Sequence, residues 1–285
     1  MKKVLVFAVL ISLLLCGCEI NINIPPAATT APAQQTQPLQ PTESTEVATE
    51  PAETAAPTAE ATMPVGDETV TVYLLDKTVL YDSGNTQCQY DEHYNIDSIT
   101  TNNIENNLMF TKTFAQKDAN GMPGKYTLLW TGESDGVENL LSWTADGKLL
   151  EAQLESYYSG LQFDYDKMGN MVQKREYYEG ILQSATRYEY EGTTLIAVYG
   201  EDPEGNKLFE CKVENGRVVE KLCLDAPDPY GYRYKYDGNN NLVESTFFSE
   251  GEEIPNMQYT YFAVEVTAER ARFLQAQQKF LLATI

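Results

Sequence analysis

The chain has 285 residues, and its 42 acidic side chains outnumber its 20 basic ones, which gives a net charge of −22. Nucleic acid and anionic lipid headgroups repel a chain of this charge, so we exclude nucleic acid as a specific partner. We interpret the charge as a solvated acidic surface that keeps a displayed protein dispersed in water, ahead of the alternative that some carboxylates bind cations.

Residues 1–18 have the features of a bacterial export signal. Two lysines precede an uncharged apolar run, Val4–Leu15. Twelve residues are too few to span a bilayer as a helix, which takes about 20, but they are typical of a secretory signal. An ordinary secretory signal with incidental cysteines is the alternative that this pattern leaves open.

The end of this run resembles the lipobox of bacterial lipoproteins. It reads Leu15-Cys16-Gly17-Cys18, with a small residue directly before the second cysteine. The resemblance implies cleavage before Cys18 and attachment of diacylglyceryl and palmitate-type acyl chains to it. Because two or three acyl chains anchor a protein stably, we expect a lipoprotein anchored to the cell membrane and facing outside the cytoplasm.

Residues 19–65 are predicted to be a disordered linker. From residue 25 onward this stretch consists largely of Pro, Thr, Ala, Gln and Glu, without aromatic residues, Lys or Arg. Such a composition buries too little apolar surface to offset the entropy of ordering. An extended stalk of this length reaches on the order of 100 Å, so we expect it to lift a folded domain of residues 66–285 away from the membrane.

Three cysteines lie in the predicted domain, Cys88, Cys211 and Cys223, and an odd number cannot pair completely. If Asn215-Gly216 is a two-residue hairpin turn, residues 211 and 223 fall on opposite faces of the hairpin, and a disulfide between them needs a bulge. We predict no such disulfide. The cysteines form no zinc-type motif, and we predict neither a metal nor a cofactor.

A strand–turn unit repeats between residues 160 and 262. Large residues alternate with charged ones and lead into turns of Asp, Asn and Gly. The second large residue of each unit falls at 165, 190, 213, 236 and 261, and a fixed period of this size marks a repeat architecture. Weaker copies precede Asp91, Asp118 and Asp146. We predict a mainly β fold, an antiparallel β-meander of 12 or more strands in one long twisted sheet that is open or curled.

Phe163–Val172 resembles the YD repeat of RHS-type bacterial surface proteins, whose core reads Tyr-Asp-x-x-Gly-Asn followed by an apolar residue. Other units depart from it, since Glu191 and Glu214 replace Asp and Val213 replaces Tyr. Large members of that family enclose a C-terminal toxin, and this chain has too few repeats to enclose a cargo. The resemblance therefore implies a β-meander at the cell surface and no toxin function.

A helix is predicted over residues 267–283. Thr267 is suited to cap its N-terminus, with Glu269 in the first turn. An apolar stripe that includes Phe273, Leu274 and Leu281 favours packing on the sheet. We expect this helix to cap the last repeat, and a helix that binds a partner or a membrane surface is the alternative.

The search for catalytic residues yields no convincing set. His93 is the only histidine, and it lies in a turn-like stretch five residues from Cys88. Pairs of carboxylates have the spacing that glycosidases use, but they recur with the repeat, as a solvent-exposed face does: Asp164/Asp166, Glu189/Glu191 and Glu252/Glu253. We predict that the protein is not an enzyme and keep a glycan hydrolase as the alternative.

The tyrosines are the remaining candidates for function. The chain has 19, and the repeats place many of them in rows across neighbouring strands. Rows of rings stabilise a sheet, and where exposed they also offer stacking surfaces for sugar rings. We predict a non-catalytic binding or scaffold module for a polysaccharide or a surface protein, with a purely structural envelope role as a further alternative. The candidate ligand-binding residues are Tyr165, Tyr188, Tyr190, Tyr234, Tyr236, Tyr259 and Tyr261.

Overall fold

The structure is a computed structural model that describes residues 69–154 and 159–284. The predicted signal peptide of residues 1–18, the predicted lipidation site at Cys18 and the predicted linker of residues 19–65 lie outside the described residues.

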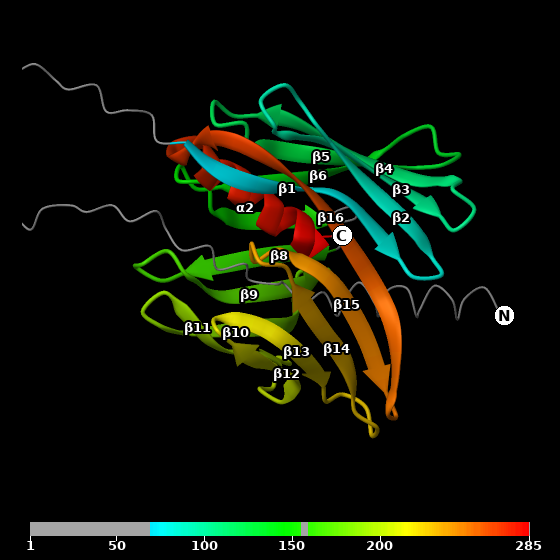
Figure 1. The fold of residues 1–285 in the computed structure, drawn as a ribbon, viewed down its shortest axis with the longest axis vertical. Helices are drawn as coiled ribbons and strands as arrows, with labels where there is room; N and C mark the ends of the chain where they lie inside the picture. Colours follow the sequence, from blue (N-terminus) through cyan, green and yellow to red (C-terminus); the bar gives the residue numbers. More distant parts are fainter. Residues whose placement is uncertain (1–68, 155–158, 285) are drawn as a thin grey trace, which may run out of the picture.

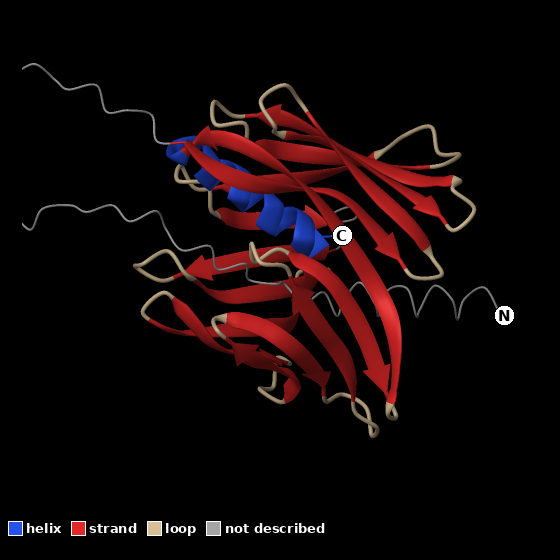
Figure 2. Cartoon of the chain, in the orientation of Figure 1, coloured by secondary structure: helices blue, strands red, loops and turns tan. Residues whose placement is uncertain are grey.

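The described chain forms sixteen strands followed by one helix (Figures 1 and 2). The described connections between consecutive strands are short turns, as the period of the repeat predicts. The elements are β1 Thr69–Leu80, β2 Gly84–Tyr90, β3 Ile96–Asn103, β4 Leu108–Lys117, β5 Pro123–Trp130, β6 Val137–Trp143, β7 Leu149–Leu154, β8 Ser159–Tyr165, β9 Met171–Tyr178, β10 Ile181–Glu191, β11 Thr194–Glu201, β12 Lys207–Glu214, β13 Arg217–Cys223, β14 Tyr230–Tyr236, β15 Leu242–Ser249, β16 Glu252–Thr267 and α2 Ala268–Thr284.

The sheet closes into a barrel. Every strand pairs antiparallel with its neighbours in the chain, and β1 pairs with β16 from Thr69↔Thr267 to Leu80↔Met257. The mainly β, antiparallel prediction is confirmed, whereas the prediction of an open or merely curled sheet is wrong. Closure pairs the N–H and C=O groups that two edge strands would otherwise expose.

Because the strands run up and down, the turns gather at the two ends of the barrel. The helix end, where β1 begins and α2 starts, holds the turns at residues 91–95, 118–122, 144–148, 166–170, 192–193, 215–216 and 237–241. The far end holds the described turns at residues 81–83, 104–107, 131–136, 179–180, 202–206, 224–229 and 250–251.

Five-residue turns of one construction recur at both ends. In the turn that starts at Asp166, its backbone N–H donates to the carbonyl of Asn170 at 2.9 Å, and its carboxylate accepts from the amides of Met168 and Asn170 at 2.8 and 2.9 Å. The spacing Asp-x-x-Gly-Asn follows from this geometry. Turns that start at residues 91, 103, 118, 144, 202 and 237 have the same backbone bonds, so Thr144 rather than Asp146 begins the third of the predicted upstream copies.

The hairpin at Asn215-Gly216 has the predicted turn, with positive φ angles of 52° and 75°. A bulge between Lys212 and Val213 then shifts the register, so that Cys211 faces Lys221 and Cys223 faces Phe209. The prediction that the two cysteines lie on opposite faces is therefore wrong, because it assumed an unbroken ladder. Neither Cys211 nor Cys223 takes part in a disulfide in the described residues.

Apolar side chains fill the inside of the barrel, and charged pairs cover the outside. One buried cluster draws on β1 to β8 and the end of α2, and a second draws on β10 to β15. Outside, ion pairs join neighbouring strands, among them Arg233 with Glu220 at 2.8 Å and Lys235 with Glu244 at 2.6 Å. The wall therefore turns a mostly apolar face inward, although Lys174, its ion-pair partner Glu176 and Lys221 are also enclosed.

The helix α2 lies against the inner side of the wall, beneath β1 (Figure 1). Its N-cap is as predicted, because the backbone N–H of Arg270 donates to Oγ1 of Thr267 at 3.2 Å. The ring of Phe280 lies 5.9 Å from that of Trp143 and 6.1 Å from that of Phe114. The helix packs on the last strand as predicted, where Ala271 and Leu274 share a buried cluster with Val264. It does not cover an open edge, because it lies inside the closed barrel, and its C-terminal part also packs on the first half of the wall.

Two glutamines let this helix enter an apolar interior. Both are buried, and their side-chain oxygens accept backbone N–H groups that have left the strand ladders: Gln278 from Leu75 at 2.7 Å, and Gln277 from Ile96 at 2.9 Å. Buried polar groups are stable only when they are bonded in this way. The helix therefore supplies hydrogen bonds that the wall lacks at these positions.

Candidate functional site

The seven candidate tyrosines share one face of the sheet, as predicted, and that face is the inside of the barrel. All seven pack against the two buried clusters, and Tyr188 and Tyr234 are only 4% and 9% exposed. They do not form a stacking surface on the outer wall. Ligand binding by these residues stays a prediction.

Aromatic residues at the helix end bridge strand pairs that separate there. In four strand pairs, the ladder of backbone hydrogen bonds stops short of the helix end. There the hydroxyl or indole N–H of an aromatic residue on the second strand donates to a backbone carbonyl of the first strand. The bonds are Tyr90 Oη to Leu75 O at 2.7 Å, Trp143 Nε1 to Pro123 O at 2.7 Å, Tyr165 Oη to Leu149 O at 2.8 Å and Tyr236 Oη to Val218 O at 2.9 Å.

The geometry of these bridges follows one rule. The β13–β14 ladder ends at Glu220↔Arg233, and continuing its register would place Tyr236 opposite Arg217. The carbonyl that it reaches belongs to the next residue, Val218. The same offset of one residue holds in the other three pairs. A side-chain donor thus takes the place of a missing ladder bond.

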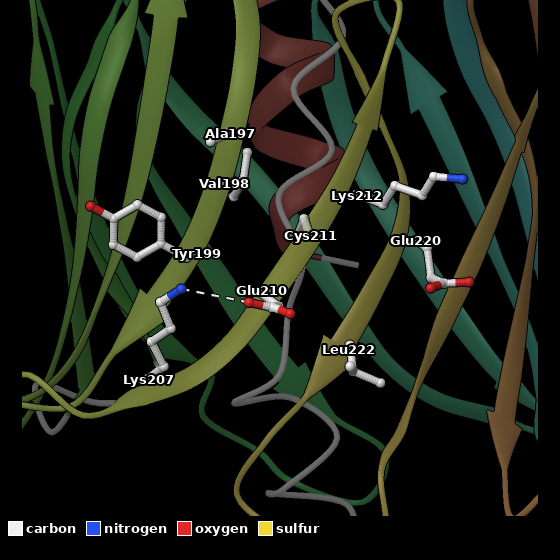
Figure 3. A pocket seen from close by; sticks show the side chains of 9 residues that line it. All are labelled: Ala197, Val198, Tyr199, Lys207, Glu210, Cys211, Lys212, Glu220 and Leu222. Carbon is white, nitrogen blue, oxygen red and sulfur yellow. Dashed lines mark ion pairs between the residues drawn. The ribbon is translucent and has the colours of Figure 1, made fainter.

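The β11–β12 pair departs from this rule, since Val213 stands where the bridging aromatic residue would be. The ladder between the two strands stops at Val198↔Cys211. A hollow of about 280 Å³ lies beside this point, over the paired residues of β11 to β13 (Figure 3). It is lined by Ala197, Val198, Tyr199, Lys207, Glu210, Cys211, Lys212, Glu220 and Leu222.

The hollow combines one ring with charges of both signs. The ring of Tyr199 stands at one side, and the Nζ atom of Lys207 lies 5.5 Å from its centroid. Lys207 also forms an ion pair with Glu210 at 3.5 Å, which Figure 3 marks with a dashed line. Across the hollow, the Nζ atom of Lys212 lies 2.6 Å from Glu214. Donors and acceptors therefore surround one aromatic face.

The protonation states at the hollow follow from its surroundings. Burial, followed by the negative charges of Glu189 and Glu201, raises the pKa of the Tyr199 phenol. A hydrogen bond with Glu214 raises the pKa of Lys212. At neutral pH the hollow therefore presents an uncharged phenol beside ammonium and carboxylate groups, which suits a polar ligand with many hydroxyl groups.

The residues considered for catalysis lie elsewhere. The thiol of Cys88 is buried in the first cluster, and burial raises its pKa to about 12. The side chain of His93 is 75% exposed. In the carboxylate pairs, Asp164 is held by Arg175 at 2.9 Å and Asp166 caps its turn. None of the three predicted pairs lines the hollow, and the described residues contain no cluster of metal-ligand side chains.

Sequence reasoning missed the hollow, because Tyr199, Lys207 and Glu210 stand outside the Tyr-x-Tyr pattern. The only signal nearby was Val213 in place of Tyr, a departure that by itself indicates no more than a degenerate repeat.

Comparison with known proteins yields likenesses of fold only. No family model matches the chain, and no curated protein matches it. Among solved structures, a porin-like protein from Bacteroides uniformis is 9% identical over 67% of this chain and 96% of its own, with a TM-score of 0.41. The Photorhabdus luminescens Tc holotoxin pore (13% identity, TM-score 0.23) and a TcdB2–TccC3–Cdc42 complex (14%, 0.22) each match 66% of this chain and 15% of their own.

The one described helix is too short and too polar to cross a membrane. Membership of the YD-repeat family stays a prediction. We take the function from the residues of this chain.

Proposed function

We propose that this protein is a lipid-anchored, extracytoplasmic binding module without catalytic activity. Acyl chains on Cys18 hold it to the membrane, and the linker of residues 19–65 carries the barrel outward. The barrel binds a carbohydrate chain at the hollow on β11 to β13. The observation that carries this proposal is the ring of Tyr199 set among Lys207, Glu210, Lys212 and Glu220 in an opening of the wall.

The chemistry of the hollow favours a sugar. The face of an aromatic ring stacks on the C–H face of a pyranose, and the phenolic hydroxyl adds a hydrogen bond. Ammonium and carboxylate groups on both sides supply donors and acceptors for ring hydroxyls. A volume of about 280 Å³ lies at the small end of ligand sites, which suits one or two units of a chain that runs over the wall.

The outer surface of the barrel supports a position in water outside the bilayer. Cross-strand ion pairs such as Arg187–Glu201 and Arg233–Glu220 lie on the outer face. Barrels that span lipid have the opposite pattern, apolar outside and polar inside. A tether rather than the wall itself would then hold the barrel to the membrane.

The test is an array of hexose, N-acetylhexosamine and uronic acid chains probed with the full mature chain. Tyr199→Ala should weaken binding to the hits about tenfold, which corresponds to about 1.4 kcal/mol. Tyr94→Ala, at an exposed turn of the helix end, is the matched control and should bind as the wild type does. Hits that Tyr199→Ala leaves unchanged, or an array without hits, would refute the proposal.

A purely structural envelope role is the second candidate, and the packing of the seven tyrosines inside the barrel favours it. In that case, Tyr199→Ala would have no effect on a cell, whereas substitutions that unfold the barrel would damage the envelope. Comparing the two kinds of variant in living cells separates the two functions.

A further inference from the structure

The far end of the barrel exposes an unusual amount of apolar surface. Of the fifteen large apolar side chains that the described residues expose, ten lie within three residues of a far-end turn, and they are 39–65% exposed. We call these ten the far-end rim. It includes Tyr81, Ile104, Trp130, Tyr178, Ile181 and Ile254. They come from six of the seven described far-end turns, and exposed apolar side chains concentrated at one end of a molecule suit an interaction site.

The same end is strongly acidic. The described far-end turns contain ten carboxylates and neither Lys nor Arg, among them Asp82, Glu105, Glu179 and Glu250. By contrast, the turns of the helix end include Lys148 and Lys167. Apolar side chains and negative charges thus share one end of the barrel.

Part of the rim is held rigid. The Trp130 ring lies 4.9 Å from that of Phe110 on the neighbouring strand, and Tyr178 faces Ile181 directly across a tight turn. Rigid aromatic residues lose little entropy on binding, and Trp and Tyr carry much of the affinity at interfaces.

The rim also points away from the attachment point. The chain enters the barrel at Thr69, where β1 starts at the helix end, and the hairpins β1–β2, β13–β14 and β15–β16 lie at the opposite side of the molecule (Figure 1). A partner approaching from outside therefore meets the far end.

We propose that the far-end rim docks a cationic amphipathic peptide segment of a partner. Its apolar face covers the exposed rings and aliphatic side chains, and its Lys and Arg side chains meet the carboxylates of the turns. Charge decides against the other occupants: a second copy of this chain would bring another acidic rim, and anionic lipid would be repelled. The site is separate from the hollow on β11 to β13.

The test uses the full mature chain held by its own anchor in nanodiscs of zwitterionic lipid. The probe is a labelled helical peptide with one leucine face and one lysine face, and fluorescence anisotropy measures its binding. The same peptide with glutamate in place of lysine is the charge control, and empty nanodiscs correct for binding to lipid. The lysine peptide should bind, its affinity should fall as salt rises, and the glutamate peptide should not bind.

Two rim variants and one matched control locate the site. The double substitution Tyr178→Ser/Ile181→Ser removes exposed apolar groups, and Glu179→Lys reverses a charge between them; each should raise the Kd about tenfold. Met168→Ser changes a residue that is 62% exposed at the helix end and should leave the Kd unchanged. Circular dichroism checks that each variant is folded.

Equal binding of the two peptides, no binding of the lysine peptide, or rim variants that bind as Met168→Ser does would each overturn the proposal. Tyr199→Ala should bind the peptide as the wild type does, so this experiment and the sugar array fail independently.

Discussion

Val213→Tyr should supply the bridge that the β11–β12 pair lacks and should be more stable than Val213→Phe. Continuing the β11–β12 register past Val198↔Cys211 places residue 213 opposite Ile196. The offset of one residue seen in the four bridged pairs then assigns the acceptor to the carbonyl of Ala197, which lines the hollow. A tyrosine at residue 213 would therefore restore the bridge that this unit lacks.

The magnitude follows from the bond that is added. A neutral hydrogen bond of this kind contributes about 1 kcal/mol to the free energy of unfolding. Val213 packs against the second buried cluster, so the larger ring adds a cost of overpacking, about 1–3 kcal/mol in a tight interior, which Val213→Phe shares. Val213→Phe adds the ring without the hydroxyl, so the difference between the two variants isolates the bridge at about 1 kcal/mol. Tyr236→Phe, which removes an existing bridge, should lower the free energy of unfolding by a similar amount.

Urea unfolding followed by tryptophan fluorescence measures these differences, and the sugar array provides a second readout. Val213→Tyr should be the more stable of the two variants at residue 213 and should leave binding to the hits unchanged, since Val213 packs on the second buried cluster and does not line the hollow. If both variants at residue 213 unfold at the same urea concentration, the bridging rule is refuted at this position.

Two further predictions concern the helix end. Burial alone would raise the pKa of the Asp91 carboxyl, but hydrogen bonds from Lys117 and Asn95 bring this pKa to about 2. The stability that the ionised carboxylate contributes to the fold is therefore complete above pH 4 and is lost as the pH falls towards 2. Asp91→Asn should cost about 1–2 kcal/mol at pH 7, and urea unfolding should show this difference shrinking below pH 4. Arg270→Ala removes the guanidinium that bonds to backbone carbonyls of two helix-end turns and should lower the free energy of unfolding by about 1–3 kcal/mol; an unchanged melting temperature would contradict this role.

The sequence predicted the features that depend on neighbouring residues. An Asp-x-x-Gly-Asn turn needs five adjacent residues, and a hairpin at Asn215-Gly216 needs two residues that tolerate positive φ. The alternation of apolar and charged residues along a strand needs only a period of two residues. The N-cap at Thr267 is local in the same sense. The turns, the strands, the repeat and the N-cap of the helix could therefore be predicted without knowing which distant parts of the chain are in contact.

Closure of the sheet and the position of the helix depend on contacts between distant residues. The β1–β16 ladder joins residues almost 200 positions apart. In the sequence of α2, Gln277 and Gln278 appear as polar interruptions of an apolar stripe. Their burial is explained only by the backbone N–H groups of Leu75 and Ile96, which donate hydrogen bonds to them. A pattern of hydrophobicity along the helix cannot reveal that its polar side chains have partners inside the barrel.

The bridges show how a single position of the repeat can affect the contact between two strands. Where the unit ends in Tyr or Trp, as at Tyr90 and Tyr236, a side chain bridges the separated strands. On β12 the same position is Val213, which packs against the second buried cluster and cannot donate such a bond. Val213→Tyr tests this reasoning because it restores the donor at one residue.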